Sequence, residues 1–118
     1  MSQDYRPGDF LVFQIESGFG LLKVLEVSGA DGNRVWHLTA YQDLFMDVEM
    51  AEDAIAGGSL TPEIAHTAMT DRAFESTQTS LLINQPLTAS EEELIRVWRE
   101  DPENHPTDRS VRLLLGLR

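Results

Sequence analysis

The sequence predicts one α+β domain, in which a twisted antiparallel β-sheet, a meander of about five strands, is packed by two or three helices. The first third of the chain is rich in aromatic and β-branched residues separated by glycine-containing turns, as antiparallel strands are. Two later segments instead repeat apolar residues at helical spacing. The chain has 118 residues, no fixed-period repeat and no long linker, which predicts a single domain over 1–118.

A β-hairpin is predicted at the start of the chain. Pro7-Gly8-Asp9 signals a turn, and residues 10–15 that follow have the composition of a strand. Residues 17–20 contain two glycines, which can supply positive φ in a hairpin turn. Residues 21–27 form the second strand, so the first two strands are expected to pair.

The second strand ends in alternating polar and apolar positions, from which Lys23 and Glu26 are expected to face water. The Asp-Gly pair at 31–32 is typical of a tight turn. It separates the second strand from a third over residues 35–41. Three successive antiparallel strands make a meander.

A helix of about ten residues is predicted next. Val48, Ala51 and Ile55 recur at helical spacing, and Asp47 precedes them as an N-cap. Gly57-Gly58 supplies the C-terminal stop. This helix is expected to cover one face of the meander.

Shorter signals lie between Pro62 and Pro86. Residues 64–69 and 81–83 are short apolar runs, each of which predicts a strand. Residues 71–79 between them are expected to form a loop or a further strand. The two predicted strands bring the sheet to about five.

A second helix is predicted from Ser90. Ser90 and Glu93 match a capping box, in which each side chain satisfies a backbone amide of the first turn. An apolar stripe within residues 94–98 follows, and Asp101-Pro102 ends the helix. Trp98 is expected to fill the space between this helix and the sheet.

A last short apolar element is predicted over residues 111–115. Thr107 or Asp108 is expected to cap it, because both residue types accept hydrogen bonds from backbone amides at helix starts. Gly116 fits its C-terminal stop. With this element the predicted number of helices is two or three.

Composition excludes several function classes. Nine basic and twenty acidic residues give a net charge of −11, which repels phosphate backbones and anionic lipid surfaces. We therefore expect no nucleic acid or membrane partner. This charge would attract a basic protein as a partner, and the alternative is that it serves only solubility. No cysteine is present, so disulfides and thiolate metal sites are excluded. Without a signal-like start or a run of about 20 apolar residues, the expected location is cytoplasmic.

Histidines provide the candidate chemistry. His37 and His66 lie on predicted strands and could meet in the fold, with Asp43 or Asp71 nearby as carboxylate, whereas His105 lies in a loop. No phosphate-binding loop, His-Glu-x-x-His or Gly-x-Ser-x-Gly motif occurs. No catalytic residue, metal ligand or cofactor is therefore assigned. Enzymatic activity stays open, with a non-enzymatic role favoured.

A candidate partner-binding surface lies where the third strand gives way to the helix. The aromatic residues there and Met46 would suit an interface, although core packing is the alternative for them. The acidic residues of the helix would attract a basic partner. The candidate residues are Tyr41, Phe45, Asp47, Glu49, Glu52 and Asp53.

The N-terminal half resembles the immunity protein 26-like family. The resemblance rests on the run over residues 7–13, the Gly18-Phe19-Gly20 turn with Leu22, Lys23 and Val24, and on Leu44-Phe45 with the helix end over 54–58. It covers residues 7–58 at most. Members of that family are thought to neutralise bacterial toxins by protein–protein binding, so the resemblance implies a binding role and no catalytic residues.

Three classes of function follow from these observations. The first is a non-catalytic protein-binding domain, such as an immunity-type inhibitor of a bacterial toxin. The second is a small-molecule-binding or enzymatic domain that uses His37 and His66 with nearby carboxylates. The third is a self-associating structural subunit, since the oligomeric state stays open.

Overall fold

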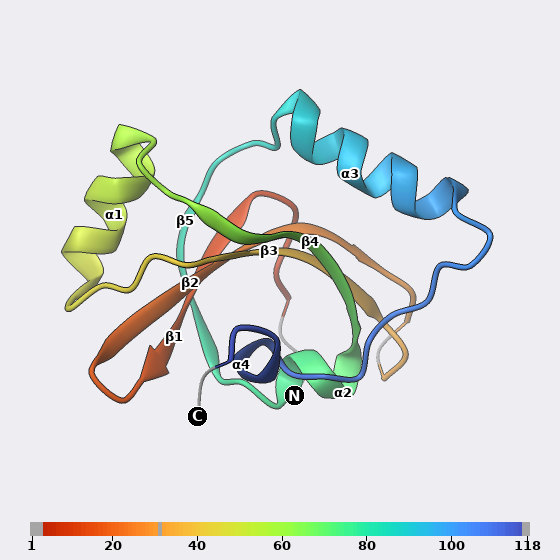
Figure 1. Cartoon of the computed structure of the whole chain (residues 1–118), viewed down its shortest axis with the longest axis horizontal. Coiled ribbons are helices and arrows are strands. Elements are labelled where there is room, and N and C mark those ends of the chain that lie inside the picture. Colours follow the sequence, from red (N-terminus) through yellow and green to blue (C-terminus); the bar gives the residue numbers. More distant parts are fainter. Residues whose placement is uncertain (1–3, 31, 117–118) are drawn as a thin grey trace.

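The computed structural model describes residues 4–30 and 32–116 of the chain, which form three layers. A five-stranded antiparallel sheet lies in the middle, with α1 and α3 on one face and α2 and α4 on the other (Figure 1). The predicted α+β class and the strand number are thus confirmed, with four helices instead of two or three. The strands are β1 Asp9–Ile15, β2 Gly18–Ser28, β3 Val35–Tyr41, β4 Pro62–Thr70 and β5 Thr79–Asn84. The helices are α1 Val48–Gly57, α2 Asp71–Glu75, α3 Ala89–Glu100 and α4 Val111–Leu114.

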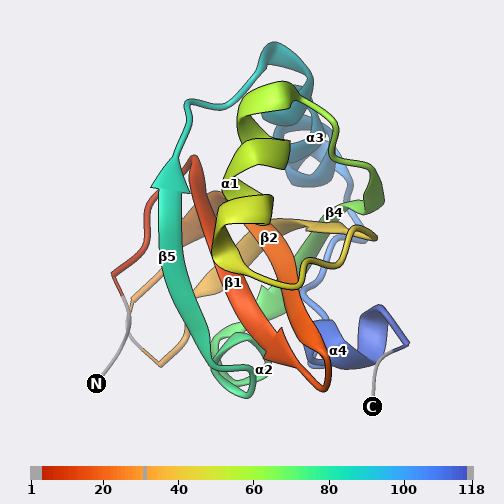
Figure 2. The same cartoon turned by 90° about the vertical axis from the view of Figure 1, so that its left-hand side faces the viewer.

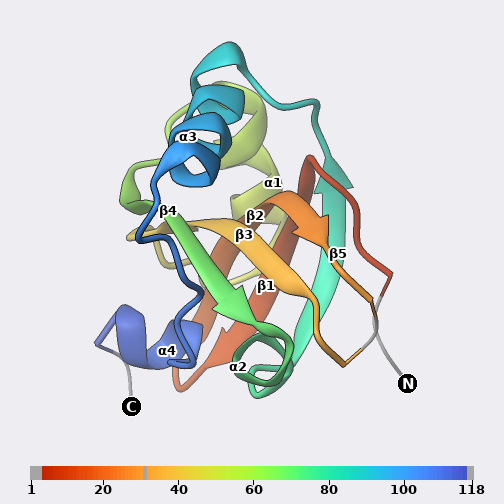
Figure 3. The same cartoon turned by 90° about the vertical axis from the view of Figure 1, so that its right-hand side faces the viewer.

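The strand order is β4-β3-β2-β1-β5. The first four strands form the predicted meander, and β5 returns to pair with the free edge of β1 (Figure 2). The outer edge of β4 is partly covered by the segment that descends from α3 to α4 (Figure 3). The Thr107 backbone accepts a hydrogen bond from the Thr70 amide at 2.9 Å and donates one to the Ala68 carbonyl at 2.8 Å.

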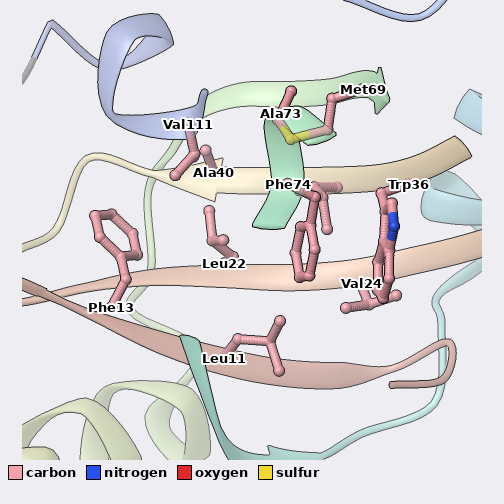
Figure 4. Close-up of a cluster of buried hydrophobic side chains, with 11 residues drawn as sticks. Leu11, Phe13, Leu22, Val24, Trp36, Ala40, Met69, Ala73, Phe74 and Val111 are labelled. Carbon is pink, nitrogen blue, oxygen red and sulfur yellow. The ribbon is translucent and has the colours of Figure 1, made fainter. Parts of the chain in front are cut away.

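Alternation along the strands divides the apolar side chains between two cores, because successive residues point to opposite faces. The larger core lies on the α2 and α4 face (Figure 4), where the Trp36 and Phe74 rings stack with centroids 3.9 Å apart. It contains Leu11, Phe13, Leu22, Val24, Trp36, Leu38, Ala40, Met69, Ala73, Phe74 and Val111. The core under α1 contains Phe10, Val12, Leu21, Tyr41, Phe45, Ala51 and Ile55.

The glycines of the first hairpin are needed for space and not for positive φ, which corrects the sequence-based expectation. Positive φ occurs at five other glycines of the described chain, including Gly32 and Gly58. A Cβ at Gly20 would lie 2.3 Å from the Phe13 ring, and one at Gly18 would lie 2.2 Å from the Phe45 carbonyl oxygen. A side chain at either position would therefore force its neighbours to shift.

The α1 helix begins and ends as predicted. The Asp47 carboxylate accepts a hydrogen bond from the Met50 amide at 2.8 Å, and Gly58 adopts the left-handed conformation at the C-terminus. The prediction for α3 was wrong by two residues. Thr88 is its N-cap, and Glu91 completes the capping box, because the spacing Thr-x-x-Glu fits as well as the spacing from Ser90.

Two further corrections concern short helices. Residues 71–75 form α2 where a loop or strand was expected, since five residues are too few to show helical periodicity. The N-cap of α4 is Ser110, whose hydroxyl accepts from the Leu113 amide, and neither Thr107 nor Asp108 caps it. Thr107 instead lies beside β4. No helix among the described residues is long and apolar enough to cross a membrane.

Candidate functional site

His37 on β3 and His66 on β4 meet, as the sequence allowed. The two side chains lie on the sheet face that α3 covers, with His37 Nδ1 2.9 Å from His66 Nε2. Their ring planes are nearly parallel, 7° apart. A contact this short is a hydrogen bond in which the N–H of one imidazole donates to the lone pair of the other.

Three groups surround the histidine pair. The Trp98 ring of α3 packs edge-on against His37, with centroids 4.7 Å apart at 83°. A carboxylate oxygen of Glu26 on β2 lies 3.9 Å from His37 Nε2, and Arg99 of α3 pairs with the same carboxylate. His37 is only 1% exposed, whereas His66 is partly exposed. His37 is therefore buried between sheet and helix, whereas His66 keeps partial contact with solvent.

The nearby carboxylate is Glu26, which corrects the expectation that Asp43 or Asp71 would serve. Asp43 accepts a hydrogen bond from the Thr61 amide, and Asp71 is occupied by Arg34 and Trp36. Glu26 lies directly opposite His37 because the β2–β3 register shifts between Val24 and Glu26. A sequence pattern carries no signal for such a bulge.

Burial keeps both imidazoles neutral at neutral pH. Desolvation lowers the pKa of His37 to about 4, helped by His66 and Arg99 and opposed by Glu26. Burial also lowers the pKa of His66. Among the described residues, no group of three or more histidine or carboxylate side chains could hold a metal ion. Three surface cavities, of about 510, 190 and 180 Å³, are lined by other residues than His37 and His66.

Lys23 lies under α3, although the sequence-based expectation placed it in water. Its ammonium is 2.9 Å from a Glu91 oxygen and lies over the Phe10 ring, and the residue is 3% exposed. The same Glu91 oxygen accepts from the Thr88 amide, so one carboxylate caps α3 and fixes it to the sheet. Burial of the charge is tolerated because it is paired.

The segment before α1 is fixed to the first hairpin through Phe45. The Phe45 backbone exchanges two hydrogen bonds with Phe19, at 2.7 and 2.9 Å, and its ring is buried. Leu44 and Met46, its neighbours in the chain, are 53% and 79% exposed, and Met50 in the first turn of α1 is 47% exposed.

The acidic candidate residues all lie on the surface. Asp47, Glu49, Glu52 and Asp53 are exposed, whereas Tyr41 is buried and stacks with Phe10 at 6.0 Å. Core packing, the alternative named for the two aromatic candidates, accounts for both Tyr41 and Phe45. We call the exposed set the α1 surface. It consists of Leu44, Met46, Asp47, Glu49, Met50, Glu52 and Asp53.

Sequence reasoning missed Leu44 and Met50 as surface residues. The distribution of charge could have indicated this surface, since no lysine or arginine occurs between Arg34 and Arg72. That stretch has the acidic residues Asp43, Asp47, Glu49, Glu52, Asp53, Glu63 and Asp71. Apolar side chains inside a stretch with one sign of charge are typical of an interaction surface.

No protein-family model, no curated protein and no solved structure matches this chain. The resemblance of residues 7–58 to the immunity protein 26-like family therefore stays a sequence-based expectation.

Proposed function

We propose that this protein is a non-catalytic protein-binding domain that captures a basic protein through the α1 surface. The observation that carries the proposal is Met46, a large apolar side chain left 79% exposed directly before the acidic helix α1. Leu44 and Met50 extend the apolar part. A folded domain loses about 25 cal/mol of favourable burial for each Å² of apolar surface left in water, so a partner that covers these side chains gains that free energy.

The α1 surface has the composition of a binding interface. Methionine adapts its shape to a partner because its side chain is unbranched and polarizable. The carboxylates of Asp47, Glu49, Glu52 and Asp53 surround the apolar side chains in sequence and stay hydrated. Charges at the rim of an interface mainly accelerate association and select the sign of the partner. A basic partner surface is the complement of this arrangement.

Within this class we propose an immunity-type inhibitor of a bacterial toxin. Two observations support the narrower proposal: the resemblance over residues 7–58 and the net charge of −11, which suits capture of a basic protein.

The test begins with capture of the partner from a native lysate and its identification. Association kinetics are then measured at low and high salt for the wild type, for Met46→Ser and for Glu49→Lys with Glu52→Lys. We expect the charge reversal to slow association and flatten its salt dependence, and Met46→Ser to accelerate dissociation. A matched control reverses Glu92 and Glu103, two exposed carboxylates at α3 and beyond it, and is expected to change the rates less.

Two outcomes would contradict the proposal. An acidic partner, or rates that respond equally to the α1 reversal and to its control, would refute the electrostatic account. A symmetric dimer that dissociates on Met46→Ser would support the self-associating alternative instead, because the α1 surface would then bind a second copy.

A further inference from the structure

The helices α1 and α3 cover the same face of the sheet, but the side chains beneath them differ in polarity. The sheet face under α1 is apolar, whereas the strands present Lys23, His37 and Thr39 to the α3 side, all of them buried. Ile95 is the buried apolar residue of α3 itself. The attachment of α3 to the sheet therefore depends more on polar contacts than the attachment of α1 does.

These polar contacts lie at two ends of α3. Near its start, Glu91 pairs with Lys23. Near its end, Trp98 packs against the His37–His66 pair, and Arg99 pairs with Glu26. The charged groups that face the histidine pair are thus Glu26 from β2 and Arg99 from α3. Since Glu26 is already paired with Arg99, a positive charge on the histidines has little uncompensated negative charge to meet.

The number of protons bound to the two imidazoles decides whether the hydrogen bond between them can form. With both rings neutral, one N–H donates to the other ring's lone pair. A single added proton keeps a donor on one side and a lone pair on the other, so the contact persists. With both rings protonated, Nδ1–H of His37 and Nε2–H of His66 point at each other across 2.9 Å, and two cations lie side by side, one of them buried.

We propose that the His37–His66 contact is a pH-sensitive latch, which holds α3 on the sheet at neutral pH and releases it when acidification protonates both imidazoles. Release separates the rings, hydrates them and removes Trp98 from the pair. The Lys23–Glu91 pair at the other end of the helix contains no imidazole, so it is proposed as the hinge about which α3 opens.

The direction of the effect follows from linkage. Both folded-state pKa values are lowered, that of His37 to about 4 from 6.5. A group with a lowered pKa stabilises the closed state fully above its unfolded value, and this stabilisation is lost as pH falls. The latch should therefore weaken progressively from about pH 6.5 downward.

Hydrogen exchange of the backbone amides tests the latch. Protection of α3 is compared with protection of α1 on the same chain, after correction for intrinsic exchange, between about pH 7 and about pH 5, above the ordinary titration range of carboxylates. We expect α3 protection to fall relative to α1 by up to about tenfold per pH unit for each proton taken up on opening. An equal change in both helices would overturn the proposal.

A double variant separates the effect of the two histidines from that of other titrating groups. His37→Gln with His66→Gln keeps polar side chains at both positions without titration, and it is expected to abolish the pH dependence of α3 relative to α1. His105→Gln removes an exposed loop histidine and is expected to leave that dependence unchanged. A folded double variant with the dependence of the wild type would contradict the latch.

A second measurement on the wild-type protein tests the proposal even if the double variant does not fold. The imidazole C–H resonances of the wild type report protonation of each histidine directly. We expect His37 and His66 to become charged together only as α3 loses protection. Full protonation of both rings while α3 stays protected would refute the proposal.

Discussion

Replacing Asp71 by asparagine should be among the most destabilising single changes in this protein. Asp71 begins α2, and its carboxylate accepts hydrogen bonds from the Gly32 amide at 2.9 Å, the Arg34 amide at 3.0 Å and the Trp36 indole at 2.8 Å. It also pairs with the Arg34 guanidinium at 3.1 Å. One carboxylate thus joins the β2–β3 turn, β3 and α2.

The magnitude follows from the burial of the ion pair. The side chains of Asp71 and Arg34 are 4% and 7% exposed. Removing one charge from a buried pair typically costs about 3–5 kcal/mol, because the other charge stays buried and loses its main counter-charge. For a domain of this size each kcal/mol lowers the melting temperature by about 4 °C, so Asp71→Asn should lower it by about 12–20 °C.

The assay is urea and thermal unfolding at neutral pH, followed by circular dichroism. Glu75→Gln is the matched control, because Glu75 also faces Arg34, at 3.7 Å, but its side chain is 46% exposed. Exposed ion pairs are worth about 0–1 kcal/mol, so the control should lose less than about 1 kcal/mol. Similar losses in the two variants would refute the reasoning that burial sets the cost.

The same carboxylate predicts part of the acid sensitivity. Burial alone would raise the pKa of Asp71, but the hydrogen bonds from Arg34 and Trp36 outweigh it and hold the pKa at about 2. A lowered carboxylate pKa gives stability that is present above the unfolded value of 3.8 and lost as pH falls toward 2. Asp71→Asn should therefore flatten the decline in stability below about pH 4. If the stability of the variant declined with pH as steeply as that of the wild type, other carboxylates would be responsible for the decline.

Two further predictions concern local structure. Thr88→Ala should cost about 1 kcal/mol of unfolding free energy, because it removes the hydroxyl that caps α3, whereas Ser90→Ala should cost less than about 0.5 kcal/mol. Equal losses in urea titrations would mean that the cap does not depend on Thr88. Gly20→Ala should destabilise by about 1–3 kcal/mol, because its Cβ would lie within the volume of the Phe13 ring. An unchanged urea midpoint would show that the ring can move aside.

The regular elements were predictable where the pattern is local. The strands β1, β2 and β3 and the helix α1 follow from strand composition, turn glycines, the Asp47 cap and the Gly58 stop, all of which act over a few residues. The start of α3 could not be predicted in this way, because Thr88 and Ser90 each stand three residues before a glutamate. Only packing, in which Lys23 draws Glu91 onto the sheet, distinguishes the two.

The candidate sites divide in the same way. Charge and residue type placed the carboxylates of α1 at the surface and made a meeting of His37 and His66 conceivable. Their carboxylate neighbour, Glu26, depends on a register shift between β2 and β3, which no single segment encodes. The exposure of Leu44 and Met46 likewise depends on Phe45, which is fixed by hydrogen bonds to Phe19 far away in the chain.

The sequence by itself determined the α+β class, the order of most elements, the acidic charge and the absence of cysteine chemistry. The tertiary structure alone decided which polar residues are buried and with which partners. Lys23 shows the reason. Alternation along a strand says only that this side chain points away from Leu22 and Val24, and whether it meets water or Glu91 depends on a helix that begins 66 residues later, at Ala89.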